Sequence, residues 1–248
     1  MNAICCIARV PDTATRIKIG PNGKSIDPEG VQYVINPFDE FALEAAIQHK
    51  EAKGGELVVM YVGQDDFAKD LRQCLAKGAD KAIHLKIDGP LGPQGISSLL
   101  AEKIRPLMPA SVFCGKQAVD GDVGGMGVML AGLLDVPAVS KVSSLELKDD
   151  TAVATREIEG GVETIDASLP CVFTFEKGAN EPRRAGLKEI MAAKKKPLEV
   201  EEVSAPAPKL SVESLELPPP RPEGRIVGEG TEAVAELVLL LREESKVI

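Results

Sequence analysis

The sequence predicts an α/β fold with a doubly wound, mostly parallel sheet. In the first half of the chain, short apolar runs alternate with segments of helical periodicity, as in parallel strands connected by helices. After Pro137, stretches of period two separated by Asp-Asp and Gly-Gly turns predict an antiparallel extension of the sheet. A proline-rich stretch and an amphipathic segment then predict an extended C-terminal arm that ends in a helix.

The elements of the parallel part follow from the positions of apolar runs and of Gly and Pro. We expect buried strands at residues 3–10, 56–63, 81–87 and 110–115. We expect helices at residues 36–55, 65–80, 94–107 and 124–137. A Pro-Asn-Gly turn predicts a strand, a turn and a second strand within residues 16–27.

Helix ends and the later elements follow from local chemistry. Asn36 is expected to cap the first helix, with Pro37 at its first position and Asp39 near its positive end. Residues 143–178 predict an antiparallel meander that includes the run "LPCVFTF". Residues 231–248 predict a closing helix that begins at a Thr cap.

Composition and charge exclude several classes of function. The net charge of −9 and an aromatic content of 3% argue against a nucleic-acid partner and against a base-stacking surface. The five cysteines form no CxxC pair and there are only two histidines, so we expect no metal site and a reducing compartment. The N-terminus resembles no signal peptide, and no apolar run could span a bilayer. These features predict a cytoplasmic, bacterial protein without direct membrane insertion.

Residues 115–127, "GKQAVDGDVGGMG", form the most unusual stretch of the chain. They follow an expected strand and lead into an expected helix, where backbone N–H groups can bind an anion and glycines allow close approach. The pattern is not GxxxxGK[ST], so it is not the loop of a P-loop nucleotidase. Two interpretations remain open at this point: a nucleotide phosphate cradle, or a glycine-rich connection with solvated aspartates, of which Asp122 could cap the helix.

Four segments are expected at the same edge of the sheet, where the parallel strands end. They are residues 5–13, 36–39, 61–64 and 115–127. In an open α/β sheet this edge is the usual ligand site. The segments contain no Ser-His-Asp set, no Cys-His pair and no HExxH motif, so we expect binding without catalysis.

A basic segment near residue 190 predicts a docking surface. The run "NEPRRAGLKEIMAAKKK" offers one apolar residue, Leu187, within a basic loop that suits an acidic partner. The helix at the end of the proline-rich arm must also dock on something to be stable.

Several motifs follow one another along the chain: "VPDT", "INPFDEFALEAA", "GADKAIHL", "GKQAVDGD", "REIEGGVET", "LPCVFTF" and "NEPRRAGLKEIMAAKKK". Together they resemble one family, the β subunit of electron transfer flavoprotein. The resemblance implies a Rossmann-like, adenine nucleotide α-hydrolase-like domain over residues 1–200. It implies an arm over residues 201–248 that docks on a larger α subunit.

The resemblance also implies a function as an electron carrier rather than a stand-alone enzyme. Such a β subunit buries an AMP without redox activity, and its α partner carries the FAD. The heterodimer accepts electrons from acyl-CoA and related dehydrogenases, as in fatty acid β-oxidation, and passes them to a quinone oxidoreductase.

Specific residues take roles from this resemblance. Those expected to contact AMP are Cys6, Asn36, Pro37, Phe38, Asp39, Val62, Gly115, Lys116, Gln117, Ala118, Val119, Asp120, Gly121, Asp122, Val123, Gly124, Gly125 and Met126. Those expected to contact dehydrogenases are Arg183, Arg184, Leu187, Ile190, Met191, Lys194, Lys195 and Lys196. Glu157 is expected to approach the partner's flavin. The resemblance implies no catalytic residue and no metal ligand.

One loop departs from the family pattern. Family members often carry Gln and Thr or Asn after the second aspartate, whereas this chain has Val123, Gly124, Gly125 and Met126 there. Backbone N–H groups would then replace side-chain hydrogen bonds to phosphate. Two alternatives stay open: an electron-bifurcating subunit that holds a second FAD in this site, and a stand-alone nucleotide-binding domain of the stress-protein type.

Overall fold

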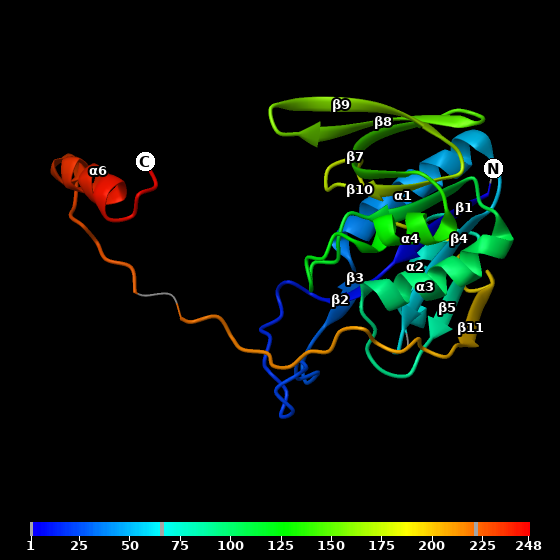
Figure 1. The fold of residues 1–248 in the computed structure, drawn as a ribbon, viewed down its shortest axis with the longest axis horizontal. Coiled ribbons are helices and arrows are strands. Elements are labelled where there is room, and N and C mark those ends of the chain that lie inside the picture. Colours follow the sequence, from blue (N-terminus) through cyan, green and yellow to red (C-terminus); the bar gives the residue numbers. More distant parts are fainter. Residues whose placement is uncertain (1, 65–66, 221–222) are drawn as a thin grey trace.

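A central nine-stranded sheet organises the protein, and the computed structural model describes residues 2–64, 67–220 and 223–248 (Figure 1). The strand order is β11-β5-β4-β1-β6-β10-β7-β8-β9. Neighbouring strands are parallel from β11 to β7, and β8 and β9 extend the sheet antiparallel. The parallel strands are β1 (Ala3–Ile7), β4 (Leu57–Gly63), β5 (Lys81–Lys86), β6 (Ser111–Gly115), β7 (Ala138–Leu147), β10 (Cys171–Phe175) and β11 (Leu198–Glu202).

Helices cover both faces of the parallel part, which confirms the doubly wound α/β prediction. On one face, α1 (Pro37–Lys53) and α2 (Ala68–Lys77) pack on the sheet. On the other face lie α3 (Pro93–Ile104), which a 3₁₀ turn at Arg105–Leu107 prolongs, and α4 (Met126–Leu134). The side chains of β1 alternate between the two cores, because successive residues of a strand point to opposite faces.

One prediction about a strand was wrong. The run Cys171–Phe175 does not belong to the antiparallel meander but lies in the middle of the sheet as β10, parallel to β6 and β7. All five of its residues are buried, as a strand covered on both faces requires. The meander proper consists of β7, β8 (Thr151–Ile158) and β9 (Gly161–Ser168), and the β8–β9 hairpin reaches beyond the helix-covered part of the sheet (Figure 1).

Other segments near the sheet also differ from expectation. The hairpin predicted over residues 16–27 reduces to a single bridge between Ile19 and Ile26, flanked by backbone hydrogen bonds from Gly20 to Ser25 and from Asp27 to Lys18. The first expected strand divides into β1 and β2 (Arg9–Pro11), and β2 pairs with β3 (Tyr33–Ile35) in a small antiparallel sheet. The helix expected to begin at residue 65 begins at Ala68, and residues 65–66 lie outside the described part of the chain.

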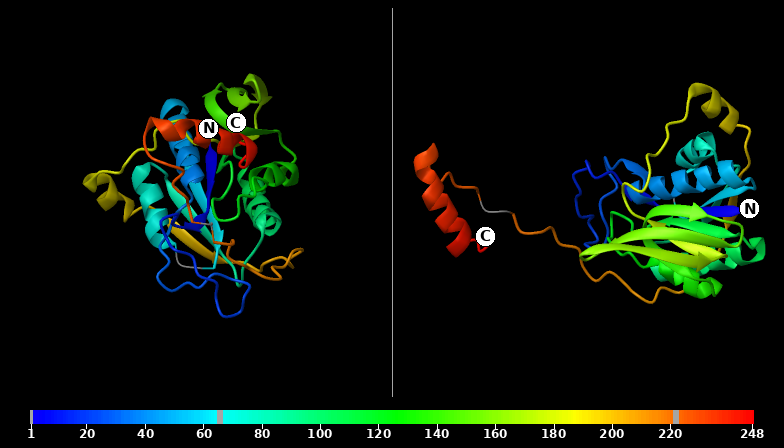
Figure 2. Two further views of the ribbon diagram at one scale, coloured as in Figure 1. Left: turned by 90° about the vertical axis from the view of Figure 1, so that its left-hand side faces the viewer. Right: turned by 90° about the horizontal axis from the view of Figure 1, so that it is seen from above.

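The C-terminal arm leaves the body after β11. Val203 and Ala205 still pack on the α3–α4 core, and the N–H of Leu215 donates to the carbonyl of Gly23 at 2.8 Å. The arm then runs to η2 (Thr231–Ala233) and α6 (Val234–Glu243), which lie clear of the body (Figures 1 and 2). Thr231 makes no capping hydrogen bond through its side chain, so the predicted cap is wrong.

The last helix has an apolar face that this chain leaves uncovered. No residue of α6 is buried, and Val234, Leu237, Val238 and Leu239 are between 42% and 54% exposed. A helix of ten residues is marginal in water without tertiary contacts. Its apolar face therefore requires a partner. None of the helices in the described ranges has the length and apolar character needed to cross a bilayer.

Candidate functional site

Asp39 joins two strand ends at the carboxyl edge of the sheet. One carboxylate oxygen, Oδ2, accepts from the N–H of Ala8 at 2.7 Å, directly after β1. The other, Oδ1, accepts from the N–H of Gly115 at 2.9 Å, at the end of β6. Because Asp39 lies in the first turn of α1, one side chain holds the helix start against both strands. Three of the four predicted segments thus meet, and β4 lies beside them with Tyr61 opposite Ile7.

Asn36 holds the loop that follows β6. Its Nδ2 donates to the carbonyl of Gln117 at 2.8 Å, and its Oδ1 accepts from the N–H of Val119 at 3.2 Å. Asn36 occupies the N-cap position of α1 as predicted, but its side chain makes no capping hydrogen bond because it is committed to this loop. An amide can satisfy a donor and an acceptor at once, which suits it to fix a loop backbone in both directions.

Burial perturbs the acidity of Asp39. The side chain is 4% exposed, and desolvation raises its pKa from 3.8 to about 7, against the hydrogen bonds from Ala8 and Gly115 that lower it. No described cation pairs with this carboxylate. Neutral pH is therefore close to the pKa of the Asp39 carboxyl. Backbone N–H donors, rather than an ion pair, hold this group.

Close packing requires glycine at two positions of the site. A Cβ at Gly115 would lie 2.3 Å from Oδ1 of Asp39 and 2.8 Å from its backbone nitrogen. A Cβ at Gly127, in the first turn of α4, would lie 2.5 Å from Cγ2 of Thr174. The missing side chains let the loop after β6 and the start of α4 approach the strand ends closely.

The tip of the loop is exposed and presents its backbone. Asp120, Gly121, Asp122, Val123 and Gly124 are exposed. Within the described residues, no protein acceptor binds the N–H groups of residues 123–125, which lead into the N-terminus of α4. Free N–H groups beside a helix N-terminus are suitable donors to a phosphate.

Asp122 does not cap α4, contrary to the prediction. Its backbone is left-handed, with φ +50°, and its Oδ1 accepts from Nε2 of Gln117 at 2.7 Å. The helix begins after Gly125 without a side-chain cap. Asp122 therefore stabilises the loop through its hydrogen bond to Gln117. It leaves the N-terminus of α4 without a side-chain cap.

The remaining predicted nucleotide residues differ in accessibility. Cys6 and Val62 are 1% and 8% exposed, so they form the floor of the edge and little of them faces solvent. Pro37 is exposed, whereas Phe38, Ala118, Val119, Gly125 and Met126 are half-buried. Lys116 is also half-buried, and its Nζ lies 2.7 Å from Oε2 of Glu176 and 5.1 Å from the centre of the Phe38 ring.

The basic segment divides into residues bound within the chain and residues that face outward. Leu187, Ile190 and Met191, on α5 (Leu187–Ala193), are 78%, 45% and 56% exposed. Arg184, Lys194 and Lys195 are exposed as well. The other two predicted contacts, Arg183 and Lys196, are engaged inside the chain: Arg183 with α1, and Lys196 with carbonyls at the end of α2.

Glu157 lies at the free end of the β8–β9 hairpin. It pairs with Val162 across the hairpin, one residue before the end of β8. It is exposed, and its apolar neighbours Ile158 and Val162 are 50% and 67% exposed. The tip of the hairpin thus presents carboxylates, since Glu159 is exposed as well, beside two exposed apolar side chains.

The sequence analysis did not identify the residues that hold the basic segment to the body. Glu44, Glu51 and Asn180 hold the basic segment to α1, and Arg72 holds it to α2. Glu44 and Glu51 are seven residues apart, hence on one face of the helix, and this spacing was a usable signal. Nothing in the sequence indicated their partner, which is about 130 residues away. Among the described residues, no three His, Cys, Asp or Glu side chains are grouped to hold a metal ion.

Comparisons with known proteins agree with this architecture. A sequence model described as "Electron transfer flavoprotein domain" matches residues 24–206. The electron transfer flavoprotein subunit beta of Bacillus subtilis is 39% identical, over all of both chains. The proteins of that name from mouse and from Bradyrhizobium diazoefficiens are 37% and 33% identical, over all of this chain and at least 99% of theirs.

Proposed function

The chain belongs to the electron transfer flavoprotein β-subunit family, and we propose that it binds AMP at the carboxyl edge of its sheet and docks dehydrogenases through residues 184–195. Family membership carries the coarser statement that the chain is part of an electron transfer flavoprotein and pairs with an α subunit. The α subunit would carry the redox-active FAD. In this proposal the β subunit is an electron-carrier component and performs no catalysis of its own.

The nucleotide proposal rests on the cluster formed by Asn36, Asp39 and Gly115. These residues fix the loop after β6 so that its glycine-rich tip presents free N–H groups next to the start of α4. Such donors suit a phosphate, and the floor formed by Cys6 and Val62 is uncharged. The exposed carboxylates of Asp120 and Asp122 would repel a phosphate, so they belong beside the ribose or the backbone.

A test of this proposal is the identity of the bound nucleotide. The heterodimer is purified without added nucleotide, and the released small molecules are identified by mass spectrometry together with a count of flavin per dimer. One AMP and one FAD per heterodimer are expected. Two FAD and no AMP would replace the proposal with the electron-bifurcating alternative. A stable monomer with a free α6 would favour a stand-alone nucleotide-binding domain instead.

The docking proposal rests on Leu187, a 78% exposed apolar side chain with basic neighbours. We expect acyl-CoA and related dehydrogenases to bind here and reduce the FAD of the α subunit, which then reduces a quinone oxidoreductase. Glu157 and the exposed tip of the β8–β9 hairpin would face that flavin.

Replacing Leu187 tests the docking role. Leu187→Ala is expected to raise the KM for a purified acyl-CoA dehydrogenase about tenfold, the size of effect expected for an exposed anchor residue at an interface. The nucleotide content should not change. Leu107→Ala, in the 3₁₀ turn after α3 on the other face of the sheet and 44% exposed, is the matched control. An unchanged KM in Leu187→Ala would remove the docking assignment.

A further inference from the structure

The segment that carries Leu187 is bound to the body by side-chain hydrogen bonds at both ends, and α5 packs beside α2 between them. Residues 180–183 bind α1, and residues 193–196 bind α2. Between these attachments lies a cavity of about 570 Å³, lined by both apolar and charged residues of α1 and α2 and by Pro182, Ala185 and Ile190. The helix α5 lies at the periphery of the body (Figure 2). The position of Leu187 therefore depends on how the two ends are held.

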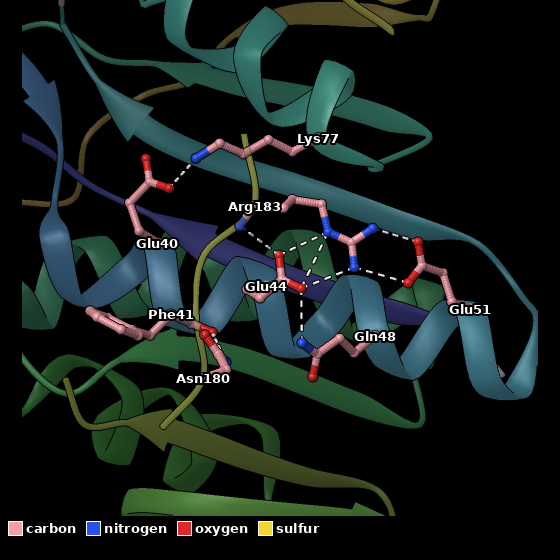
Figure 3. Close-up of polar contacts among 8 residues, drawn as sticks. All are labelled: Glu40, Phe41, Glu44, Gln48, Glu51, Lys77, Asn180 and Arg183. Carbon is pink, nitrogen blue, oxygen red and sulfur yellow. Dashed lines mark hydrogen bonds and ion pairs between the residues drawn. The ribbon is translucent and has the colours of Figure 1, made fainter. Parts of the chain in front are cut away.

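The first attachment centres on Arg183 and Glu44 (Figure 3). The guanidinium Nε donates to Oε2 of Glu44 at 2.9 Å, and Nη2 donates to Oε1 at 2.9 Å. The backbone N–H of Arg183 donates to the same Oε2 at 3.1 Å. Glu44 thus accepts hydrogen bonds from both the side chain and the main chain of the segment. An ordinary surface ion pair joins side chains only.

Neighbouring groups complete the attachment. Nη2 of Arg183 also donates to Oε2 of Glu51 at 2.9 Å, about two turns further along the same face of α1. Nε2 of Gln48 donates to Oε1 of Glu44 at 2.9 Å, and Nδ2 of Asn180 donates to the carbonyl of Phe41 at 2.8 Å (Figure 3). Nη1 of Arg183 donates to Oε1 of Glu51, so every nitrogen of the guanidinium is bonded within the chain.

Burial makes this attachment sensitive to the loss of either partner. The Glu44 side chain is only 5% exposed, against 32% for Arg183. A buried carboxylate without its cation is strongly unfavourable, so the pair is retained or the segment moves. The second attachment is made of backbone carbonyls: Arg72 donates to that of Ala193 at 2.8 Å, and Lys196 donates to that of Leu75 at 2.9 Å.

We infer that Arg183 and Glu44 are a positioning pair that fixes where Leu187 stands, and that Arg183 acts through the segment rather than by touching a dehydrogenase. The inference rests on the proposed docking function. Its geometry distinguishes Arg183 from Arg184, which is exposed and, within the described residues, forms no ion pair.

The decisive variant is Glu44→Gln, because it leaves every charge of the basic segment in place. If Arg183 contacted the acidic partner directly, releasing it from Glu44 would leave docking unchanged or improve it. If Arg183 positions the segment, docking weakens. The heterodimer is compared as wild type, Glu44→Gln, Arg183→Gln and the double variant, with Arg184→Gln as the control for the loss of one positive charge.

Two readouts are used on each heterodimer. We expect Glu44→Gln and Arg183→Gln each to raise the KM for an acyl-CoA dehydrogenase about tenfold at unchanged kcat, with no further rise in the double variant. Amide hydrogen exchange over residues 184–192 should quicken in the same variants and stay at the wild-type rate in Arg184→Gln. Arg183→Lys, which keeps the charge without the fork of donors, should restore docking only in part.

The outcomes separate this inference from the docking proposal. A wild-type KM and wild-type exchange in Glu44→Gln, with a raised KM in Leu187→Ala, would overturn the positioning role alone. Additive effects of Glu44→Gln and Arg183→Gln would overturn it as well. An unchanged KM in Leu187→Ala would overturn the docking proposal, and the positioning role with it.

Discussion

Helix α1 fastens two different parts of the chain, and it does so by opposite physical means. At its N-terminus, Asn36 and Asp39 are buried and bind backbone groups of the strand ends and of the loop after β6. Two to four turns later, Glu44 and Glu51 bind the guanidinium of Arg183. The attachment at Asp39 relies on a desolvated carboxylate without a cation. The attachment at Arg183 is a network of ion pairs that is open to solvent on one side.

This difference gives the two attachments opposite responses to pH. The folded pKa of Asp39 is raised to about 7, so from about pH 4 to 7 the folded chain holds a proton that the unfolded chain has lost. The free energy of unfolding therefore falls as the pH rises through this window. Hydrogen bonds from Arg183 lower the pKa of Glu51, so its contribution is present above its unfolded pKa and is lost as the pH falls through the folded value.

The largest effect should come from adding one carbon atom beside Asp39, at the N-terminal attachment of α1. Gly115→Ala would place a Cβ against the Asp39 side chain and the backbone at Phe38, so we expect a loss of about 3 kcal/mol in the free energy of unfolding. Urea denaturation measures it. Gly121→Ala is the matched control, since its Cβ would meet nothing within 4 Å. Equal stability of the two variants would mean that the residues around Asp39 shift at little cost to make room for the added methyl group.

A smaller effect should come from removing the titration of Asp39. The stability that wild type loses between pH 5 and pH 8 should exceed the loss in Asp39→Asn by about 2 kcal/mol. Urea denaturation of both proteins over this range tests the difference. Asn also leaves one of the two backbone donors without an acceptor, so the comparison concerns the slope with pH and not the absolute stability. Parallel pH profiles would contradict the raised pKa.

The smallest effect should come from the exposed end of the Arg183 network, at Glu51. Glu51→Gln is expected to lower the free energy of unfolding by about 0.5 kcal/mol near neutral pH, because surface ion pairs contribute little. The difference from wild type should vanish in strong acid and shrink in about 1 M salt. Chemical denaturation at low and high salt measures it. A difference independent of salt would show that shape, not charge, dominates at Glu51.

The sequence was sufficient for the elements that local patterns specify. Four buried strands, the helices between them and the edge at which the loop after β6 lies could all be read from apolar runs and from Gly and Pro. The central strand β10 could not, because its five residues, four of them apolar, fit equally well in a meander or in a core. Only its pairing with β6 and β7 distinguishes the two.

The sequence by itself determined the family, the α/β class, the position of the glycine-rich loop and the exposed character of Leu187. The tertiary structure decided which polar residues are used: it took Asn36 and Asp122 away from helix caps to brace a loop, and it turned Arg183 inward to Glu44. The physical reason is that a buried polar group binds whatever partner the packing brings to it. For Arg183 that partner is 139 residues away, beyond the reach of any local pattern.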